Sequence, residues 1–164
     1  MIELRVLTPD DWAVWRELRL AALTEAPYAF GAKLADWQNE GDTTERWRSR
    51  LGIPGSRNFV ALRQGKPIGM VTGVRPPGSD TVELMSLWVS EEARGQGVGD
   101  RLVRAVEEWA AEGGARLLQL AVMPDNEHAL NLYRRRGLTE TGCLGDEQGE
   151  GQKELIMTKP LPAA

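Results

Sequence analysis

The sequence predicts a single domain of the α+β or mixed α/β class. Its 164 residues suit one domain, because domains usually contain about 100 to 200 residues. Apolar residues alternate with polar ones in some segments and recur every three or four residues in others, which indicates both strands and helices. No repeat, low-complexity segment or linker divides the chain. We therefore expect residues 1–164 to form one domain.

The first strand and the first helix follow directly on one another. Apolar residues alternate over residues 2–6, which is typical of a half-buried strand. Thr8 can cap a helix, and Pro9 suits the first helical position. We expect this helix to continue to about Thr24, with one apolar stripe formed by Trp15, Leu18 and Ala22.

A second helical region and three strands occupy the middle of the chain. The helical region covers about residues 33–51 and is interrupted near Gly41, after which Thr43 or Thr44 can start it again. Two strands, predicted at 58–63 and 67–75, are joined by a short glycine-containing turn, and a third is predicted at 81–89. These three strands therefore read as a meander.

The last part of the chain alternates again between helix and strand. A helix is predicted over 97–112, followed by a buried strand over 116–122 and a second helix from Asn126 to Arg136. A glycine-rich segment then reads as a final hairpin that ends at about 153–159. The helix over 97–112 carries an apolar residue at every fourth position, namely Val98, Leu102, Val106 and Ala110.

The composition restricts the classes of function. A formal net charge of −4 argues against nucleic acid as the main partner, which normally requires a basic face. The only cysteine, Cys143, and the only histidine, His128, exclude an intramolecular disulfide, a thiolate zinc cluster and a two-histidine metal site. The N-terminus has no signal-peptide pattern, and no apolar stretch approaches the ~20 residues that span a bilayer. We therefore expect a soluble cytoplasmic protein with no metal and no membrane partner.

A glycine-rich loop joins the third strand of the meander to the following helix. Its sequence is Arg94-Gly95-Gln96-Gly97-Val98-Gly99. Glycine lets the backbone turn sharply and approach a ligand closely, and the free N–H groups at a helix start bind anions. Arg94 would add a positive charge beside them. A pyrophosphate group is the natural ligand for this arrangement.

Two other nucleotide-binding patterns do not fit this loop. A P-loop for NTP hydrolysis needs Gly-Lys-Ser or Gly-Lys-Thr after the first glycine, and no lysine follows here. In the dinucleotide fingerprint the third glycine would stand at position 100, whereas this chain has Gly99 and then Asp100. A nicotinamide-dependent oxidoreductase is therefore disfavoured. A tight turn without a ligand remains the alternative for the loop alone.

A second motif follows nearly thirty residues later. It runs Val122-x-Pro124-x-Asn126-x-x-Ala129-x-x-Leu132-Tyr133-x-x-x-Gly137-Leu138. Together with the Arg94–Gly99 loop, in this order, it resembles the signature of the GNAT family of N-acetyltransferases. The order of strands and helices is also similar to that family over the rest of the chain, while the N-terminal third matches more loosely.

The resemblance implies a fold and a cofactor site. The GNAT fold is a mixed, mostly antiparallel sheet whose central strands splay apart and hold the pantetheine arm of acetyl-CoA like an additional strand. In this sequence the arm would lie along Leu87, Trp88 and Val89, with residues 120–122 on the other side of the wedge, and Asn126 would contact the pantetheine region. The pyrophosphate would meet the loop residues Arg94, Gly95, Gln96, Gly97, Val98 and Gly99.

The resemblance also implies the catalytic groups. Tyr133 would be the general acid that protonates the leaving thiolate, since a tyrosine with a pKa near 10 is protonated at neutral pH. Glu83 is the candidate general base, although some relatives work through water instead. Period-2 alternation would place it on the face of Met85, Leu87 and Val89, where apolar neighbours would raise its pKa. The amine would attack the thioester directly, without an acyl-enzyme.

Cys143 and His128 are the other residues that could take part in covalent catalysis, and neither suits it. Cys143 reads as a stray, partly buried thiol with no histidine near it in the sequence, and His128 reads as a solvated helix residue on a different face from Tyr133. The alternative from another class is a non-catalytic acyl-CoA-binding or sensor module of the same fold.

The resemblance implies that the acceptor is an amine, either a small molecule or a peptide. In the family it binds over the two N-terminal helices and the last hairpin. A weak excess of acidic and aromatic residues there hints at a cationic substrate. The alternative is that the charged residues form a solvated helix face and that the regularly spaced tryptophans belong to the core. Family members often form dimers, so pairing of two copies through the last strands is a further expectation. The residues behind this hint are Glu25, Tyr28, Phe30, Asp36, Trp37, Glu40, Asp42, Glu45 and Trp47.

Overall fold

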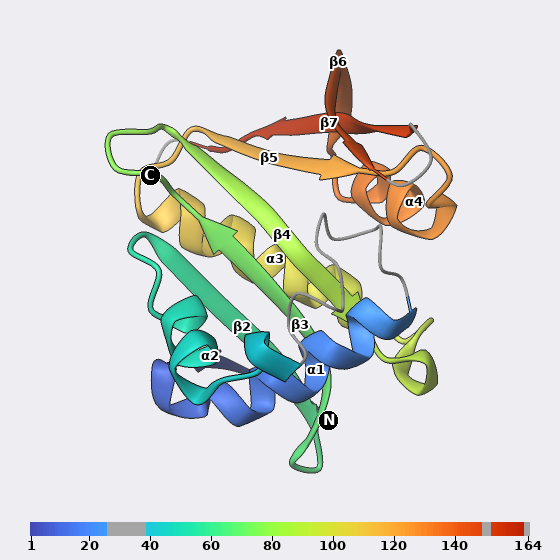
Figure 1. Ribbon diagram of the computed structural model, residues 1–164. Helices are drawn as coiled ribbons and strands as arrows, with labels where there is room; N and C mark the ends of the chain where they lie inside the picture. Colours follow the sequence, from blue (N-terminus) through green and yellow to red (C-terminus); the bar gives the residue numbers. More distant parts are fainter. Residues whose placement is uncertain (26–38, 149–151, 163–164) are drawn as a thin grey trace.

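A computed structural model describes residues 1–25, 39–148 and 152–162 of the chain (Figure 1). Every strand and helix expected in this part of the chain is present, with shifts of at most three residues at the ends. The elements are β1 (Ile2–Leu7), η1 (Pro9–Asp11), α1 (Trp12–Glu25), η3 (Asn39–Gly41), α2 (Thr44–Leu51), β2 (Ser56–Arg63), β3 (Lys66–Val74), β4 (Thr81–Val89), η4 (Glu91–Ala93), α3 (Val98–Glu112), β5 (Leu117–Val122), α4 (Glu127–Arg135), β6 (Thr139–Gln148) and β7 (Gln152–Pro160).

The strands form one seven-stranded sheet in the order β1-β2-β3-β4-β5-β7-β6. All neighbouring strands are antiparallel except β4 and β5, which are parallel. The mixed, mostly antiparallel sheet is therefore confirmed. Helices cover both of its faces: α1 and α2 lie on one face, and α3 lies on the other (Figure 1).

The two central strands separate after a short paired segment. Residues Thr81–Glu83 of β4 pair with Leu117–Gln119 of β5, and the pairing ends there. Residues 84–89 of β4 continue without a partner on that side, while β5 pairs with β7 up to Val122. The expected splay of the central strands is therefore confirmed, and it opens toward the end of β4 that leads into the glycine loop (Figure 1).

A bulge interrupts β4 at Ser86. This residue has a φ of 57°, and the register between β3 and β4 shifts between Met70 and Thr72. A bulge inserts one unpaired residue, so the inward and outward directions of the side chains exchange beyond it. Ser86 is therefore the point at which the two halves of β4 present different faces.

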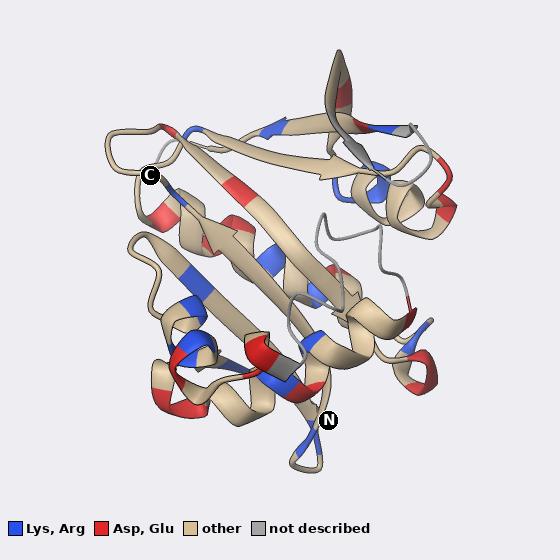
Figure 2. Ribbon diagram, in the orientation of Figure 1, with Lys and Arg blue, Asp and Glu red and all other residues tan. Residues whose placement is uncertain are grey.

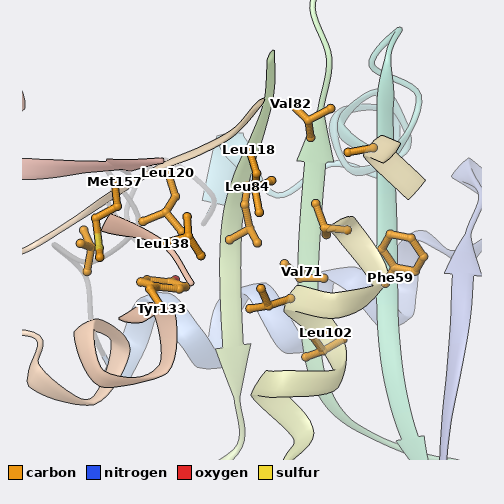
Figure 3. Close-up of a cluster of buried hydrophobic side chains, with 14 of the residues drawn as sticks. Phe59, Val71, Val82, Leu84, Leu102, Leu118, Leu120, Tyr133, Leu138 and Met157 are labelled. Atoms are coloured by element: carbon orange, nitrogen blue, oxygen red, sulfur yellow. The ribbon is translucent and has the colours of Figure 1, made fainter. Parts of the chain in front are cut away.

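Two apolar clusters hold the helices against the sheet. The first fills the face under α3 and α4 and includes the stripe from Val98 to Ala110 that the sequence predicts (Figure 3). The second fills the face under α1 and α2 and includes Trp15, Leu18 and Ala22. Gly73 in β3 allows α3 to approach, because a Cβ there would lie 2.8 Å from Trp109 Cζ3. Both predicted apolar stripes are confirmed.

The helix starts follow local rules. Thr43, not Thr44, caps α2, since its hydroxyl accepts a hydrogen bond of 3.2 Å from the Arg46 N–H. The backbone N–H of Thr8 donates to the Asp11 carboxylate at 2.8 Å at the start of the first helical turn. Within the described ranges, no helix combines the length and the apolar character needed to cross a bilayer.

Candidate active site

The glycine loop leads directly into α3. Gly95 and Gly97 have φ values of 76° and 80°, which residues with a side chain rarely adopt. The position of a Cβ at either glycine is open, with no atom within 4 Å. Gly97 precedes the first helical residue, Val98, and α3 begins without a side-chain cap. The N–H groups of the first turn, with the helix dipole behind them, are therefore available to an anion.

Side chains around the loop are engaged with one another. Arg94 Nε donates to the Val89 carbonyl at 3.0 Å, and its guanidinium also bonds to the Glu25 carboxylate at the end of α1. Gln96 Nε2 donates to the Glu92 carbonyl at 3.2 Å, and its side-chain oxygen accepts from Arg63. A shallow depression of about 280 Å³ adjoins the loop, lined by Arg63, Gln64, Lys66, Ile68 and Glu92.

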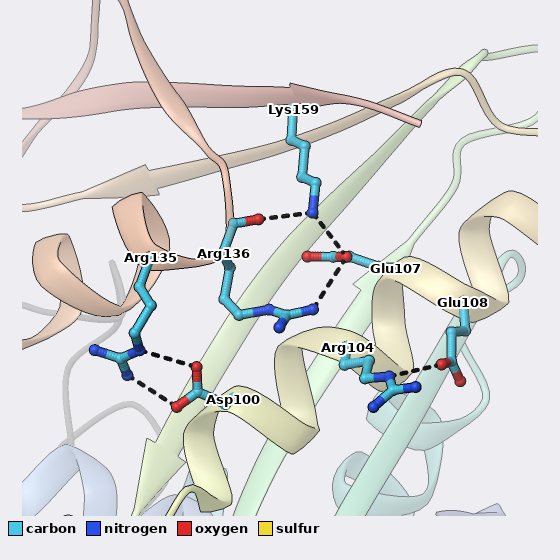
Figure 4. Close-up of polar contacts among 7 residues, drawn as sticks. All are labelled: Asp100, Arg104, Glu107, Glu108, Arg135, Arg136 and Lys159. Atoms are coloured by element: carbon cyan, nitrogen blue, oxygen red, sulfur yellow. Dashed lines mark hydrogen bonds and ion pairs between the residues drawn. The ribbon is translucent and has the colours of Figure 1, made fainter. Parts of the chain in front are cut away.

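The two sequence motifs meet at Gly99. A Cβ at this position would lie 3.0 Å from Leu132 Cδ2 of α4, so the glycine permits close packing between the start of α3 and α4. Next to it, Asp100 accepts two hydrogen bonds from Arg135 of α4, at 3.1 and 2.8 Å (Figure 4). Of the loop glycines, Gly99 therefore serves helix packing, while Gly95 and Gly97 shape the turn.

A second ion-pair group holds the same, C-terminal end of α4. Glu107 of α3, a mostly buried residue, lies 3.0 Å from the Lys159 ammonium of β7 and 3.6 Å from Arg136 (Figure 4). Lys159 also donates to the Arg136 carbonyl at 2.6 Å. These bonds tie α3, α4 and β7 together, so α4 holds a defined position relative to the sheet.

That position places Tyr133 in the apolar cluster. Its side chain is 6% exposed and lies beside Leu138 with Leu120 of β5 close by (Figure 3). Burial raises the pKa of the Tyr133 phenol well above its ordinary value of 10, because the phenolate would lose its hydration. At neutral pH the hydroxyl is therefore protonated, as a proton donor must be.

Asn126 has a structural use in this site. Its side-chain oxygen accepts a hydrogen bond of 3.2 Å from the Ala129 N–H and so caps α4. The side-chain oxygen is thus occupied, and the amide NH₂ group is the part of Asn126 that a cofactor would contact.

The wedge between β4 and β5 has apolar walls. Leu87 and Val89 pack on the cluster under α3, whereas Trp88 packs on the cluster under α1 and α2. On the other side, Leu120 and Val122 are buried. Residues 84–89 of β4 form the free edge of this wedge, because their backbone groups on this side do not pair with β5.

The prediction that Glu83 shares a face with Leu87 and Val89 is wrong. The bulge at Ser86 reverses the alternation, so Leu87 and Val89 pack on the same cluster as Val82 and Leu84, on the face opposite to Glu83. Glu83 is itself exposed rather than enclosed by apolar neighbours. It stands at the last paired position of β4, opposite Gln119, where the wedge begins.

Two of the acidic residues expected near an acceptor, Asp42 and Glu25, are bound to other side chains. Asp42 accepts from Arg16 at 2.8 and 2.6 Å and from Trp47 Nε1 at 2.8 Å. These hydrogen bonds, from Arg16 first and Trp47 second, lower the pKa of Asp42 to about 2. Trp47 is fully buried and belongs to the core. Four residues of the predicted acceptor surface lie outside the described residues, namely Tyr28, Phe30, Asp36 and Trp37.

Sequence reasoning missed a polar group under α1 and α2. Arg50 of α2 points inward to Asn58, Thr72 and Ser86, and Arg19 of α1 also reaches Ser86. A signal existed for Arg19, which stands four residues after Trp15 on the apolar stripe of α1. Two other assignments can be compared directly with the structure: His128 is exposed, as expected, whereas Cys143 is exposed and not partly buried.

Comparisons with known proteins agree with this geometry. The model of the acetyltransferase (GNAT) family matches residues 13–138. An L-2,4-diaminobutyric acid acetyltransferase of Nocardia farcinica is 34% identical, over 84% of this chain and 87% of its own length.

Solved structures share the whole fold. A GNAT acetyltransferase from Streptococcus pneumoniae has a TM-score of 0.80 at 21% identity, over 99% of this chain and 100% of that one. The PaiA N-acetyltransferase from Thermoplasma acidophilum, solved in complex with coenzyme A, has a TM-score of 0.74 at 18% identity, over 98% and 99% of the two chains. The chain therefore belongs to the acetyltransferase (GNAT) family and is an N-acetyltransferase that takes its acetyl group from acetyl-CoA.

Proposed function

We propose that this enzyme acetylates the primary amine of a small molecule or peptide, by direct attack of the amine on acetyl-CoA and without an acyl-enzyme. The observation that carries the proposal is the separation of β4 from β5 after Glu83. The free edge of residues 84–89 offers N–H and C=O groups to the amide-containing pantetheine arm, which would lie along Leu87, Trp88 and Val89.

The glycine loop would hold the pyrophosphate. Gly95 and Gly97 let the backbone pass close to the phosphates, and the N–H groups at the start of α3 provide donors and a favourable dipole. The side chains of Arg94 and Gln96 lie around the same loop, and the NH₂ group of Asn126 would meet the pantetheine part.

Tyr133 would act as the general acid. As the amine nitrogen bonds to the thioester carbon, the C–S bond breaks and the thiolate takes the phenolic proton of Tyr133. Two observations support this role: α4 is held in place by its bonds to α3 and β7, and burial keeps the phenol protonated.

Glu83 would be the base that removes a proton from the incoming amine. An amine with a pKa near 10 is mostly protonated at neutral pH and cannot attack until it loses that proton. Glu83 stands at the start of the wedge and is exposed, so an acceptor or a bridging water can reach it.

The setting and the assembly are also proposals. We place the enzyme in the cytoplasm, because acetyl-CoA is a cytoplasmic metabolite. Two copies would pair through the last strands, since β6 is an edge strand of the sheet and its Leu144 is 59% exposed. Light scattering after size-exclusion chromatography tests the pairing, and a monomeric mass would contradict it.

Thermal unfolding with acetyl-CoA, with NAD as the control, tests the cofactor site first. Ligand at about 100 times its dissociation constant adds ~2.7 kcal/mol to stability, which raises Tm by several degrees for a domain of this size. If Tm does not change at millimolar acetyl-CoA, the Arg94–Gly99 loop is only a turn and does not bind the cofactor. A shift without CoA release on a broad amine panel would favour the non-catalytic sensor module instead.

A further inference from the structure

Five polar residues form a buried group where α1 and α2 cover β2, β3 and β4. We call this group the arginine cluster, and it consists of Arg19, Arg50, Asn58, Thr72 and Ser86. Asn58, Thr72 and Ser86 are at most 9% exposed, and Arg19 is 6% exposed. Burying polar side chains costs free energy, so such a group in an otherwise apolar layer requires an explanation.

The contacts of Arg50 are all with neutral groups. Its guanidinium donates to Asn58 Oδ1 at 3.1 Å, to Thr72 Oγ1 at 3.2 Å and to Ser86 Oγ at 3.5 Å, and it lies 4.9 Å from the centre of the Trp15 ring. In the part of the chain that the structure describes, no carboxylate comes within ion-pair distance of Arg50. Its charge is therefore solvated by dipoles and a ring but not neutralised.

A second guanidinium increases the positive potential. Arg19 donates to the same Ser86 hydroxyl at 3.1 Å. Burial lowers the pKa of Arg50 to about 10, and burial together with the charge of Arg50 lowers the pKa of Arg19 to about 10. Both side chains stay charged at neutral pH, because each lowered pKa still lies well above 7.

The cluster lies beside the site of the chemistry. Ser86 is three residues beyond Glu83, where β4 leaves β5, and directly precedes the Leu87–Val89 segment proposed for pantetheine. The cluster lies on the face of the sheet that α1 and α2 cover, whereas α3 covers the other face (Figure 1). Arg50 is the one member of the cluster that is not fully buried. In Figure 2 the helix that carries Arg50, α2, shows both blue and red segments.

We propose that the arginine cluster binds a carboxylate of the acceptor, so that the substrate is an amino acid whose amine is acetylated while its carboxylate pairs with Arg50 beside Ser86. This inference rests on the proposed function, because it places the acceptor on the α1 and α2 side of the wedge. It adds a carboxylate to the cationic substrate hinted at by the sequence, for which two of the acidic residues, Asp42 and Glu25, are bound to Arg16 and Arg94.

Matched acceptors test this proposal with the unmodified enzyme. One series is L-lysine, its carboxamide and cadaverine, and the other is L-2,4-diaminobutyric acid, its carboxamide and 1,3-diaminopropane. Each series keeps the amine and removes the carboxylate charge. We expect kcat/KM, measured by CoA release, to be at least about ten-fold higher for the acid in one series, because a charge-assisted pair to guanidinium is lost in the others. If kcat/KM is the same for the acid, its carboxamide and the diamine in both series, the proposal is overturned.

The variant Arg50→Gln separates recognition from folding. It should abolish the preference for the acid, mainly through a higher KM, while leaving kcat/KM for the diamine nearly unchanged. Arg48→Gln is the matched control on the same helix, because Arg48 is exposed and pairs with Asp10. Thermal unfolding should show no loss of stability in Arg50→Gln, since it removes an unneutralised buried charge. An unchanged preference in a folded Arg50→Gln protein would contradict the proposal.

Calorimetry distinguishes failure of this inference from failure of the proposed function. If no amine is turned over, the proposed function fails, and the two amino acids are then titrated into the protein saturated with CoA. Binding to the unmodified protein that Arg50→Gln weakens at least about ten-fold would still support the carboxylate site. No binding of either amino acid would overturn it.

Discussion

Arg94 of the glycine loop and Glu25 at the end of α1 form an ion pair between elements that are 69 positions apart in the sequence. Arg94 also donates to the Val89 carbonyl at the end of β4. The pair therefore connects the helix on the acceptor side with the loop proposed for the pyrophosphate. It also partly neutralises the cation that the loop contributes to anion binding.

Glu25→Gln should strengthen the binding of CoA. Removing the carboxylate leaves the Arg94 charge to the pyrophosphate, and we expect a gain of about two- to five-fold at low salt that shrinks at high salt, because the pair is half-exposed. Isothermal titration at two ionic strengths measures this. Glu17→Gln, the same change at an exposed position of α1, is the control, and an equal gain there would contradict a specific effect.

Gly97→Asp should weaken CoA binding much more than Gly97→Asn. Both residues tolerate the positive φ of 80° better than other side chains, and no atom lies within 4 Å of their Cβ, so the two variants should lose similar stability, roughly 1 kcal/mol. Only aspartate places a negative charge beside the N–H groups at the start of α3. We expect at least about ten-fold lower affinity for the aspartate variant. Equal affinities would mean that the pyrophosphate lies elsewhere.

Tyr133→Phe should lower kcat while the dissociation constant of CoA stays within about two-fold. Loss of a general acid costs about 10²- to 10⁴-fold, and phenylalanine preserves the packing against Leu138. Because burial raises the pKa of Tyr133, the unmodified enzyme should keep its kcat up to about pH 10 without a loss from ionisation of this group. A Tyr133→Phe enzyme with unchanged kcat would refute the acid role.

Glu83→Gln should lower kcat/KM at neutral pH by about 10- to 100-fold. The loss should diminish toward pH 10, where the free amine no longer needs a base. A pH profile of kcat/KM for both proteins measures this. A reduction of less than about two-fold across the whole range would assign the proton transfer to water without Glu83.

Asp42→Asn should destabilise the fold near neutral pH by a few degrees in Tm, because Arg16 loses its anionic partner. The pKa of Asp42 is lower in the folded protein, about 2, than the ordinary value of about 3.9 in an unfolded chain. Its carboxylate therefore favours folding above pH ~4, and this contribution disappears as the pH falls from ~4 to ~2. Denaturant melts at pH 7, 4 and 2.5 should show the two proteins converging, and a constant difference would contradict the ion pair.

The sequence by itself determined the elements of this protein, its two motifs and its family. Helix stripes such as Trp15, Leu18 and Ala22, helix caps such as Thr43, and the glycines of the Arg94–Gly99 loop are properties of short segments. Their periodicity and backbone requirements can be read without knowing what they pack against. The resemblance carried by the loop and the Asn126–Tyr133 helix then indicated the splayed sheet.

The tertiary structure decided what each side chain of the site faces. A one-residue bulge at Ser86 turns Leu87 and Val89 away from the face of Glu83, and strand periodicity cannot register such an insertion. Likewise the charged sequence of α2 does not show that Arg50 points inward. In the structure it contacts Asn58, Thr72 and Ser86, which come from three different strands. Charge and burial depend on neighbours brought together by folding, and Arg19 and Ser86 of the arginine cluster are 67 positions apart in the chain.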